Sequence, residues 1–327
     1  MSSNQPVEIG DVAATARRLL DQIDRVIVGK DAVIELLLVA LFCDGHVLLE
    51  DVPGIGKTML AKTLARSLGC TFSRIQFTPD LLPSDITGVN VFNQKTSEFE
   101  YRGGPIMAEV VLADEINRAG PRTQAALLEA MEERQVTVDG VTRALGYPFL
   151  VLATQNPVEL EGTFPLPEAQ LDRFLLRVAM GYPSREDERT ILRRFRVDNP
   201  LTEIQPLIGG AELRRIAARC RQVACHAVVE DYLLDLVHAS RTDPAVELGV
   251  SPRGALAWLR AAQALAAIRG RAFVTPDDLQ TLAQPVLAHR LILSPESRLR
   301  GQRAEDVIKR LLTQTPAPVE ESWSARQ

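Results

Sequence analysis

The sequence predicts an α/β domain built on a mainly parallel sheet, followed by a domain made only of helices. From Arg25 to about Tyr182, short apolar runs alternate with stretches of helical periodicity. After Pro183 the apolar runs stop, and helical periodicity continues to about Leu312. A glycine-rich loop directly after the first apolar run is the third observation, because it is typical of the first strand–helix connection in such a domain.

Five apolar runs are continuous enough to be strands buried on both faces, as in a parallel sheet. They are residues 46–50, 72–77, 109–113, 149–153 and 175–179. Helices are predicted between them, for example over residues 57–68 and 122–133. In the second domain, Ser251-Pro252 and Thr275-Pro276 each place a capping hydroxyl before a first-turn proline, which marks two helix starts.

Two segments interrupt the α/β pattern. Residues 85–104 contain alternating apolar positions and predict a small hairpin. Residues 135–147 begin with a second alternating stretch, in which Asp139-Gly140 is a strong two-residue turn signal.

Composition narrows the classes of function. The chain has 327 residues, of which 46% are hydrophobic and 24% charged, and a formal net charge of −5. This charge argues against bulk attraction to nucleic acid or to an anionic membrane. No secretory leader and no apolar run of membrane-spanning length is evident, so no membrane insertion and a cytoplasmic location are expected. The four cysteines and four histidines show no metal-ligand spacing.

The sharpest motif is the loop from Asp51 to Thr58, between a predicted strand and a predicted helix. Glycines allow backbone N–H groups to surround a phosphate, and the helix that follows adds the positive end of its dipole. Lys57 would reach the β- and γ-phosphates, and Thr58 would offer a hydroxyl to Mg²⁺. Asp51 stands where the usual pattern has glycine, and its effect on ATP affinity is an open question. A turn that precedes a helix by chance is the alternative.

The second motif is Asp114-Glu115 at the end of a buried run. Asp114 would hold Mg²⁺, mostly through water, and Glu115 would align and deprotonate the attacking water. Taken alone, the pair is better explained as a solvated acidic turn, and the glycine loop upstream reverses that preference. Asn156 follows the next run, and it could orient the same water because the carboxyl ends of neighbouring strands meet at one sheet edge. Asn156-Pro157 is also a common turn.

With these motifs the sequence resembles the MoxR-type AAA+ ATPases over nearly its whole length. The resemblance rests on the run 46–50 before the loop and on five further segments. These are residues 113–119 (ADEINRA), 123–132 (TQAALLEAME), 153–157 (ATQNP), 161–174 (EGTFPLPEAQLDRF) and 249–254 (GVSPRG).

The resemblance implies an AAA+ core with a five-stranded parallel sheet and a helical lid, divided into residues 1–24 (helical extension), 25–183 (core), 184–312 (lid) and 313–327 (flexible tail). It implies ATP and Mg²⁺ as cofactors and Walker B at Asp114 and Glu115. Asn156 would be sensor 1, Arg173 the arginine finger and Arg253 sensor 2. The implied nucleotide-binding residues are Val28, Gly29, Pro53, Gly54, Ile55, Gly56, Lys57, Thr58, Met59 and Asp114.

The two arginines have plainer alternatives. Arg173 stands beside Asp172 and could form a surface ion pair, which contributes about 0–1 kcal/mol. Arg253 lies near a capped helix start and could be structural. Whether it acts on its own subunit or on a neighbour is open.

The resemblance further implies a homo-oligomeric ring, a hexamer, that remodels or matures client proteins, for example by cofactor or metal insertion. A partner with a von Willebrand factor A domain is implied as well. A nucleotide-dependent scaffold without hydrolysis is one alternative, although the Asp114-Glu115 pair argues against it. A DNA-acting AAA+ protein is another, and no basic domain supports it.

Overall fold

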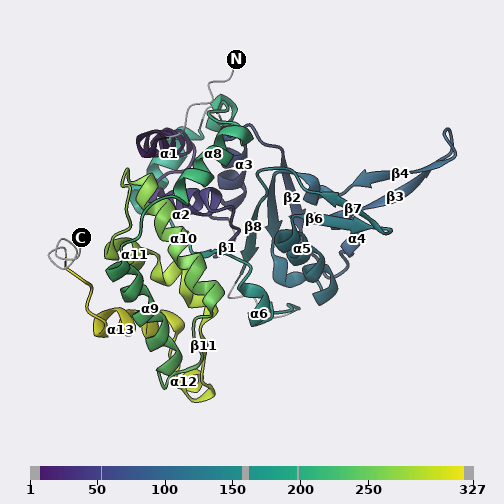
Figure 1. Ribbon diagram of the computed structural model, residues 1–327. Helices are drawn as coiled ribbons and strands as arrows, with labels where there is room; N and C mark the ends of the chain where they lie inside the picture. The colour runs from purple at the N-terminus through teal and green to yellow at the C-terminus, as the bar shows by residue number, and fades with distance from the viewer. Residues whose placement is uncertain (1–7, 53, 157–161, 197–198, 320–327) are drawn as a thin grey trace.

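The computed structural model describes residues 8–52, 54–156, 162–196 and 199–319. It contains an α/β part and a helical part that lie side by side (Figure 1). The α/β part is built on five parallel strands in the order β2-β5-β8-β1-β9, which confirms the predicted fold class. The strands are β1 (Val47–Glu50), β2 (Phe72–Gln76), β5 (Val110–Asp114), β8 (Leu150–Gln155) and β9 (Leu176–Val178).

Alternate side chains of these strands enter two different apolar clusters, as the two-residue repeat of a strand requires. Val47 and Leu49 of β1 belong to one cluster, and Leu48 belongs to the other. The first cluster continues into α2 (Asp31–Phe42) and α3 (Lys57–Ser67), and the second into α5 (Pro121–Glu133). The sheet is therefore covered by apolar side chains on both faces. The polar groups described below lie at or near the ends of its strands.

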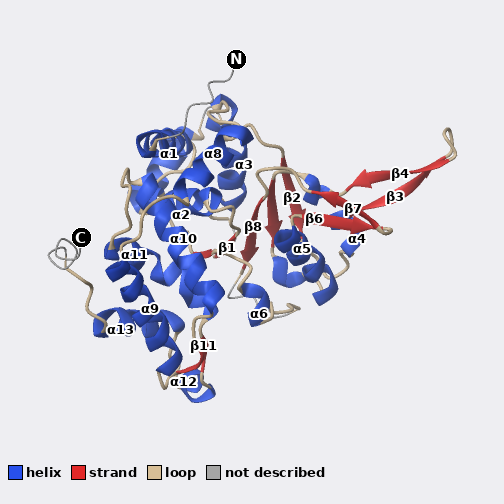
Figure 2. Ribbon diagram, viewed as in Figure 1, coloured by secondary structure: helices blue, strands red, loops and turns tan. Residues whose placement is uncertain are grey.

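The chain between β2 and β5 carries α4 (Pro83–Thr87), the hairpin of β3 (Gly88–Asn93) and β4 (Glu98–Gly103), and η1 (Pro105–Met107). A second hairpin consists of β6 (Gln135–Val138) and β7 (Val141–Ala144), with Asp139 and Gly140 at the turn, both at positive φ. The first hairpin projects from the body, and the second lies beside its base (Figure 2). Asn90 donates a hydrogen bond of 2.6 Å to Asp139 and so joins the two.

The helical part follows β9. Ser251 and Thr275 immediately precede α10 and α11, as predicted from the sequence, and the Ser251 hydroxyl accepts a hydrogen bond from the N–H of Gly254. Its helices are α7 (Arg185–Arg194), η3 (Pro200–Glu203), α8 (Gly210–Cys220), α9 (Ala227–Thr242), α10 (Pro252–Ile268), α11 (Pro276–Leu287), η4 (Ala288–Arg290), α12 (Pro295–Leu299) and α13 (Ala304–Gln314).

The expectation that strands are absent after Pro183 is wrong in one detail. The short strands β10 (Val246–Leu248) and β11 (Ile292–Leu293) pair in antiparallel fashion within the helical part. Strands of three and two residues are too short to show an alternating pattern in the sequence.

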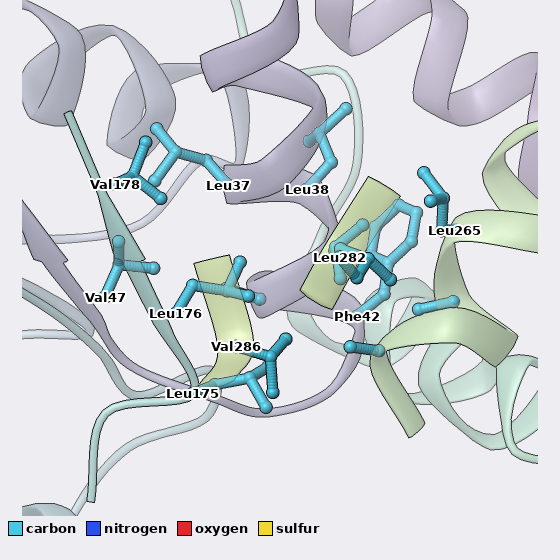
Figure 3. Packing of buried hydrophobic residues seen from close by; sticks show 14 of the residues in the cluster. Leu37, Leu38, Phe42, Val47, Leu175, Leu176, Val178, Leu265, Leu282 and Val286 are labelled. Atoms are coloured by element: carbon cyan, nitrogen blue, oxygen red, sulfur yellow. The ribbon is translucent and has the colours of Figure 1, made fainter. Parts of the chain in front are cut away.

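The amino-terminal helix α1 (Ile9–Asp24) packs against α10, α2 and α3, so it joins the helical part to the sheet. Figure 3 shows the same continuity deeper in the core, where Phe42 of α2 lies against Leu282 of α11 and Leu176 of β9 lies close to Val286. One apolar cluster thus runs from the sheet into the helical domain. No helix in the described ranges is long and apolar enough to cross a membrane.

Candidate functional site

The loop after β1 has the backbone shape that its glycines predict. Gly54 and Gly56 have φ values of +84° and +93°, where a side chain is strained. A Cβ built on either glycine would meet no atom of the chain within 4 Å, so their open side faces the cavity that both line. Helix α3 begins at Lys57, and Gly56 offers its first turn no side-chain cap. Its amino-terminal N–H groups therefore face an anion-binding position. Pro53 lies outside the described residues.

The side chain of Lys57 lies over this loop. Its ammonium donates a hydrogen bond of 2.8 Å to the carbonyl oxygen of Asp51, which leaves further N–H donors for phosphate oxygens. Partial burial lowers the pKa of Lys57, and the charges of Asp114, Asp51 and Glu115 act in the opposite direction. The next residue, Thr58, lines the same cavity.

Asp114 and Glu115 lie where β5 ends, and a single hydroxyl holds both. Thr154 of β8 donates a hydrogen bond of 2.6 Å to Oδ1 of Asp114 and accepts one of 2.8 Å from the N–H of Glu115. Glu115 has a φ of +58°, a conformation that non-glycine residues seldom adopt, so its backbone needs such support. Thr154 is 1% exposed, so its buried hydroxyl holds both the carboxylate of Asp114 and the backbone of Glu115 in place.

The neighbouring strand β2 adds two polar side chains. The Arg74 guanidinium donates to Oδ2 of Asp114 from both Nε, at 3.1 Å, and Nη2, at 2.6 Å. Gln76 donates from Nε2 to Glu115 Oε2 at 2.9 Å. Arg118 contacts the same oxygen, with 3.2 Å between its Nε and Oε2 of Glu115.

With the exception of Arg118, these groups line one cavity of about 470 Å³ at the carboxyl edge of the sheet, here called the phosphate cavity. Its lining consists of Asp51, Gly54, Gly56, Lys57, Thr58, Met59, Arg74, Gln76, Asp114, Glu115, Thr154 and Asn156. Carboxylate and hydroxyl oxygens occur together here with an anion-binding loop. Because Mg²⁺ is commonly held by one or two such oxygens together with substrate phosphates, these donors fit a magnesium–nucleotide complex.

A second cavity of about 590 Å³ adjoins the same loop and is mostly apolar in lining. Val28, Ile55 and Met59 line it, together with Tyr182, Leu192 and Phe195 from the chain around α7. A largely apolar cavity next to a phosphate site suits a purine base. Gly29 is not among the residues that line this cavity, and a Cβ on it would fall 2.5 Å from the Asp187 carboxylate.

Arg173 and Arg253 lie at the opposite edge of the sheet. They line a cavity of about 320 Å³ together with Asp44, Gly45 and His46, the residues that lead into β1. The phosphate loop follows the other end of the same strand. The structure therefore does not bring these arginines to the phosphate cavity of their own chain.

The ion pairs around these arginines differ from the one considered for Arg173, which was a surface ion pair with Asp172. Asp172 pairs with Arg290 at 2.6 Å and lies 3.7 Å from Arg253, whereas no ion pair joins it to Arg173 in the part of the chain that the structure describes. Arg253 donates a hydrogen bond of 2.5 Å to Glu132 of α5. Arg173 is thus a half-buried cation that no carboxylate among the described residues neutralises.

Comparison with known proteins identifies the family. The model of the ATPase family associated with various cellular activities (AAA) matches residues 46–176, and the AAA lid domain model matches residues 238–311. The chain is 51% identical to the uncharacterized protein YeaC of Bacillus subtilis, over 93% of this chain and 95% of the relative. It is 43% identical to the Chaperone MoxR1 of Mycobacterium tuberculosis, over 93% of this chain and 82% of the relative. The chain belongs to the MoxR family of AAA+ ATPases.

A solved structure supports the same assignment for the MoxR-family fold. The crystal structure of a candidate ATPase from Cytophaga hutchinsonii matches with a TM-score of 0.89 at 37% identity. The match covers 95% of this chain and 97% of the other.

In this MoxR-family chain, the structure gathers Gly54, Gly56, Lys57, Thr58, Met59, Asp114, Glu115 and Asn156 at the phosphate cavity. Val28 and Ile55 line the adjoining apolar cavity. Three further residues that line the phosphate cavity were not identified from the sequence, namely Arg74, Gln76 and Thr154. The available signal was their position, because each is a polar residue at or near the carboxyl end of a strand that neighbours β5.

Proposed function

We propose that this chain binds Mg·ATP between the two adjoining cavities and hydrolyses it. One observation carries the proposal: three neighbouring strands, β5, β8 and β1, direct an acidic pair, an amide and a phosphate loop into a single cavity. Ligands of open α/β sheets bind at this edge. The base would lie against Val28 in the apolar cavity, and the triphosphate would lie along the loop.

Each side chain then has a role that matches its position. Lys57 and the first turn of α3 bind and orient the phosphates. Thr58 and Asp114 hold Mg²⁺, the latter mostly through water. The ion supplies charge neutralisation at the β- and γ-phosphates.

The remaining residues act on the attacking water. Glu115 accepts a proton from this water, and Gln76 and Arg118 hold the Glu115 carboxylate in place. Asn156 orients the same water.

The two arginines act on another subunit in this proposal. Arg173 and Arg253 lie at the edge of the sheet remote from their own phosphate loop, so each would stabilise transition-state charge at the site of a neighbour. An arginine in this role can contribute about 10³–10⁵ in rate. Hydrolysis would then depend on a closed ring, for which we propose a hexamer.

The proposed biological role is the remodelling or maturation of client proteins, including cofactor or metal insertion, together with a partner that carries a von Willebrand factor A domain. The chaperone name of the 43% identical relative and the family resemblance support this role. The projecting β3–β4 hairpin would contact the client, and nucleotide-driven shifts of the helical domain relative to the α/β part would change how the hairpin is presented.

The test is a pair of substitutions at the phosphate cavity. Glu115→Gln keeps the shape and the metal-binding residues but removes the base, so ATP binding should persist while hydrolysis falls by about 10²-fold or more. Lys57→Ala should abolish binding itself. Calorimetry and phosphate-release assays measure the two effects. Unchanged hydrolysis in Glu115→Gln, or undiminished affinity in Lys57→Ala, would overturn the assignment.

A further inference from the structure

Asp51 departs from the usual phosphate-loop pattern, and its carboxylate has a defined place in the structure. Oδ1 accepts a hydrogen bond of 3.0 Å from the N–H of Val52. Oδ2 accepts one of 2.5 Å from the N–H of Gly181, which is 130 residues away in the sequence. Both oxygens therefore bind backbone donors, and the carboxylate ties the start of the loop to a distant segment.

That segment, residues 180–182, lies between β9 and α7 and is held from a second side. The ammonium of Lys30 donates to the carbonyl oxygens of Met180, Gly181 and Tyr182, at 2.8, 3.1 and 3.2 Å. Gly181 has a φ of +65°, so the segment has a bend that favours glycine. Asp51 thus binds the N–H of a segment whose carbonyl groups Lys30 binds.

The segment of residues 180–182, which Asp51 and Lys30 hold, forms part of the wall of the apolar cavity. Met180, Tyr182 and Lys30 line that cavity together with Gly54 and Ile55 of the phosphate loop. Asp51 therefore links the residues around a bound phosphate chain to the residues around a bound base. A glycine at position 51 would keep the carbonyl oxygen that receives Lys57 but would leave the Gly181 N–H without its carboxylate acceptor.

We propose that Asp51 is a positioning residue that fixes the base-binding wall relative to the phosphate loop. The proposal rests on the proposed function in taking the two cavities as one nucleotide site. It implies that the carboxylate contributes to the affinity for a complete nucleotide, which spans both cavities. It does not contribute to the affinity for inorganic tripolyphosphate, which occupies the loop alone.

Calorimetric titration of the full-length protein with ADP and with tripolyphosphate tests this division. In Asp51→Gly, loss of a hydrogen bond to a charged acceptor should weaken ADP binding by about tenfold. Tripolyphosphate binding should stay within about twofold. Asp51→Asn keeps an oxygen that can accept from Gly181, so it should restore most of the ADP affinity. Asp235→Asn, an exposed carboxylate on α9, is the matched control and should change neither.

Two outcomes overturn the proposal. Equal loss of ADP and tripolyphosphate binding in Asp51→Gly means that Asp51 only shapes the loop. Undiminished ADP binding in Asp51→Gly means that the hydrogen bond between Gly181 and Asp51 has no role in binding the nucleotide. Amide hydrogen exchange at Gly181 without nucleotide separates this result from failure of the proposed function. Exchange should accelerate in Asp51→Gly and not in Asp51→Asn, even if the wild-type protein binds no nucleotide. Lys30→Met is a second variant, and it should also weaken the binding of ADP while leaving the binding of tripolyphosphate unchanged.

Discussion

The guanidinium of Arg74 lies against the carboxylate of Asp114, with 2.6 Å between Nη2 and Oδ2. The two residues come from adjacent parallel strands, and Arg74 is paired in register with Leu112, two residues before Asp114. The same Nη2 also donates to Gln76 at 2.6 Å, which fixes the orientation of the guanidinium. A positive charge thus lies beside the carboxylate that is proposed to hold Mg²⁺.

This contact predicts that Arg74 sets the magnesium requirement of the site. Because the guanidinium and Mg²⁺ compete for the charge of Asp114, Arg74→Gln should lower the Mg²⁺ concentration needed for half-maximal binding of a fluorescent ADP by several-fold. Arg74→Lys keeps the positive charge and should resemble the wild-type protein. A higher Mg²⁺ requirement in Arg74→Gln would show that Arg74 supports the metal site instead.

Thr154 provides a second prediction, because one hydroxyl holds both acidic residues. Thr154→Val keeps the shape of the side chain but removes the donor to Asp114 and the acceptor for Glu115 N–H. We expect kcat to fall by about tenfold or more with ADP affinity nearly unchanged, and the free energy of unfolding to fall by about 1–3 kcal/mol. Thr154→Ser, which retains the hydroxyl, should recover kcat. If Thr154→Val and Thr154→Ser have equal kcat, the hydroxyl has no part in the reaction.

The sequence predicts the sheet, the phosphate loop and the acidic pair because each depends on a local pattern. Continuous apolar runs identify buried strands, and Gly54 and Gly56 identify a turn that needs positive φ. The contact between Arg74 and Asp114 depends instead on which strands are neighbours and in what register. The bond from Gly181 to Asp51 joins residues from two segments that are adjacent only in the fold. Local patterns carry no information on either pairing.

The same limit applies to Arg173 and Arg253. A motif resemblance predicts that they act on a nucleotide, but only the strand topology places them at the edge opposite to their own phosphate loop. The proposal that they act on a neighbouring subunit therefore rests on their side of the sheet and not on their sequence spacing.

Placement at opposite edges predicts complementation between inactive subunits. Arg173→Ala and Lys57→Ala should each abolish most ATP hydrolysis when pure. In mixed rings, an intact Lys57 site can meet an intact Arg173 from its neighbour, so phosphate release should reappear with a maximum at intermediate mixing ratios. Mixing Lys57→Ala with the double variant lacking both residues is the matched control and should stay inactive. Stable mixed rings without recovered activity would exclude Arg173 as the residue that acts between subunits.

The buried imidazole of His46 predicts how stability depends on pH. Its Nδ1 accepts a hydrogen bond of 3.0 Å from the N–H of Val151, and its Nε2 lies 3.1 Å from the carbonyl oxygen of Met131, so the ring is neutral in the fold. Burial, with a smaller effect from the positive charge of Arg134, lowers the pKa of His46 from 6.5 to about 3. The unfolded chain therefore binds a proton below pH 6.5 that the folded chain does not bind.

The free energy of unfolding should accordingly be unaffected by His46 above pH 6.5 and should fall as the pH drops from 6.5 toward 3. At pH 5 the loss from this residue is about 2 kcal/mol. Chemical denaturation at pH 7.5 and at pH 5 measures it, with His46→Gln as the variant. That variant should be less stable at pH 7.5 but should lose less stability on acidification. His238→Gln replaces an exposed histidine and should keep the wild-type pH dependence, whereas an equal loss in His46→Gln would show that other groups cause the acid sensitivity.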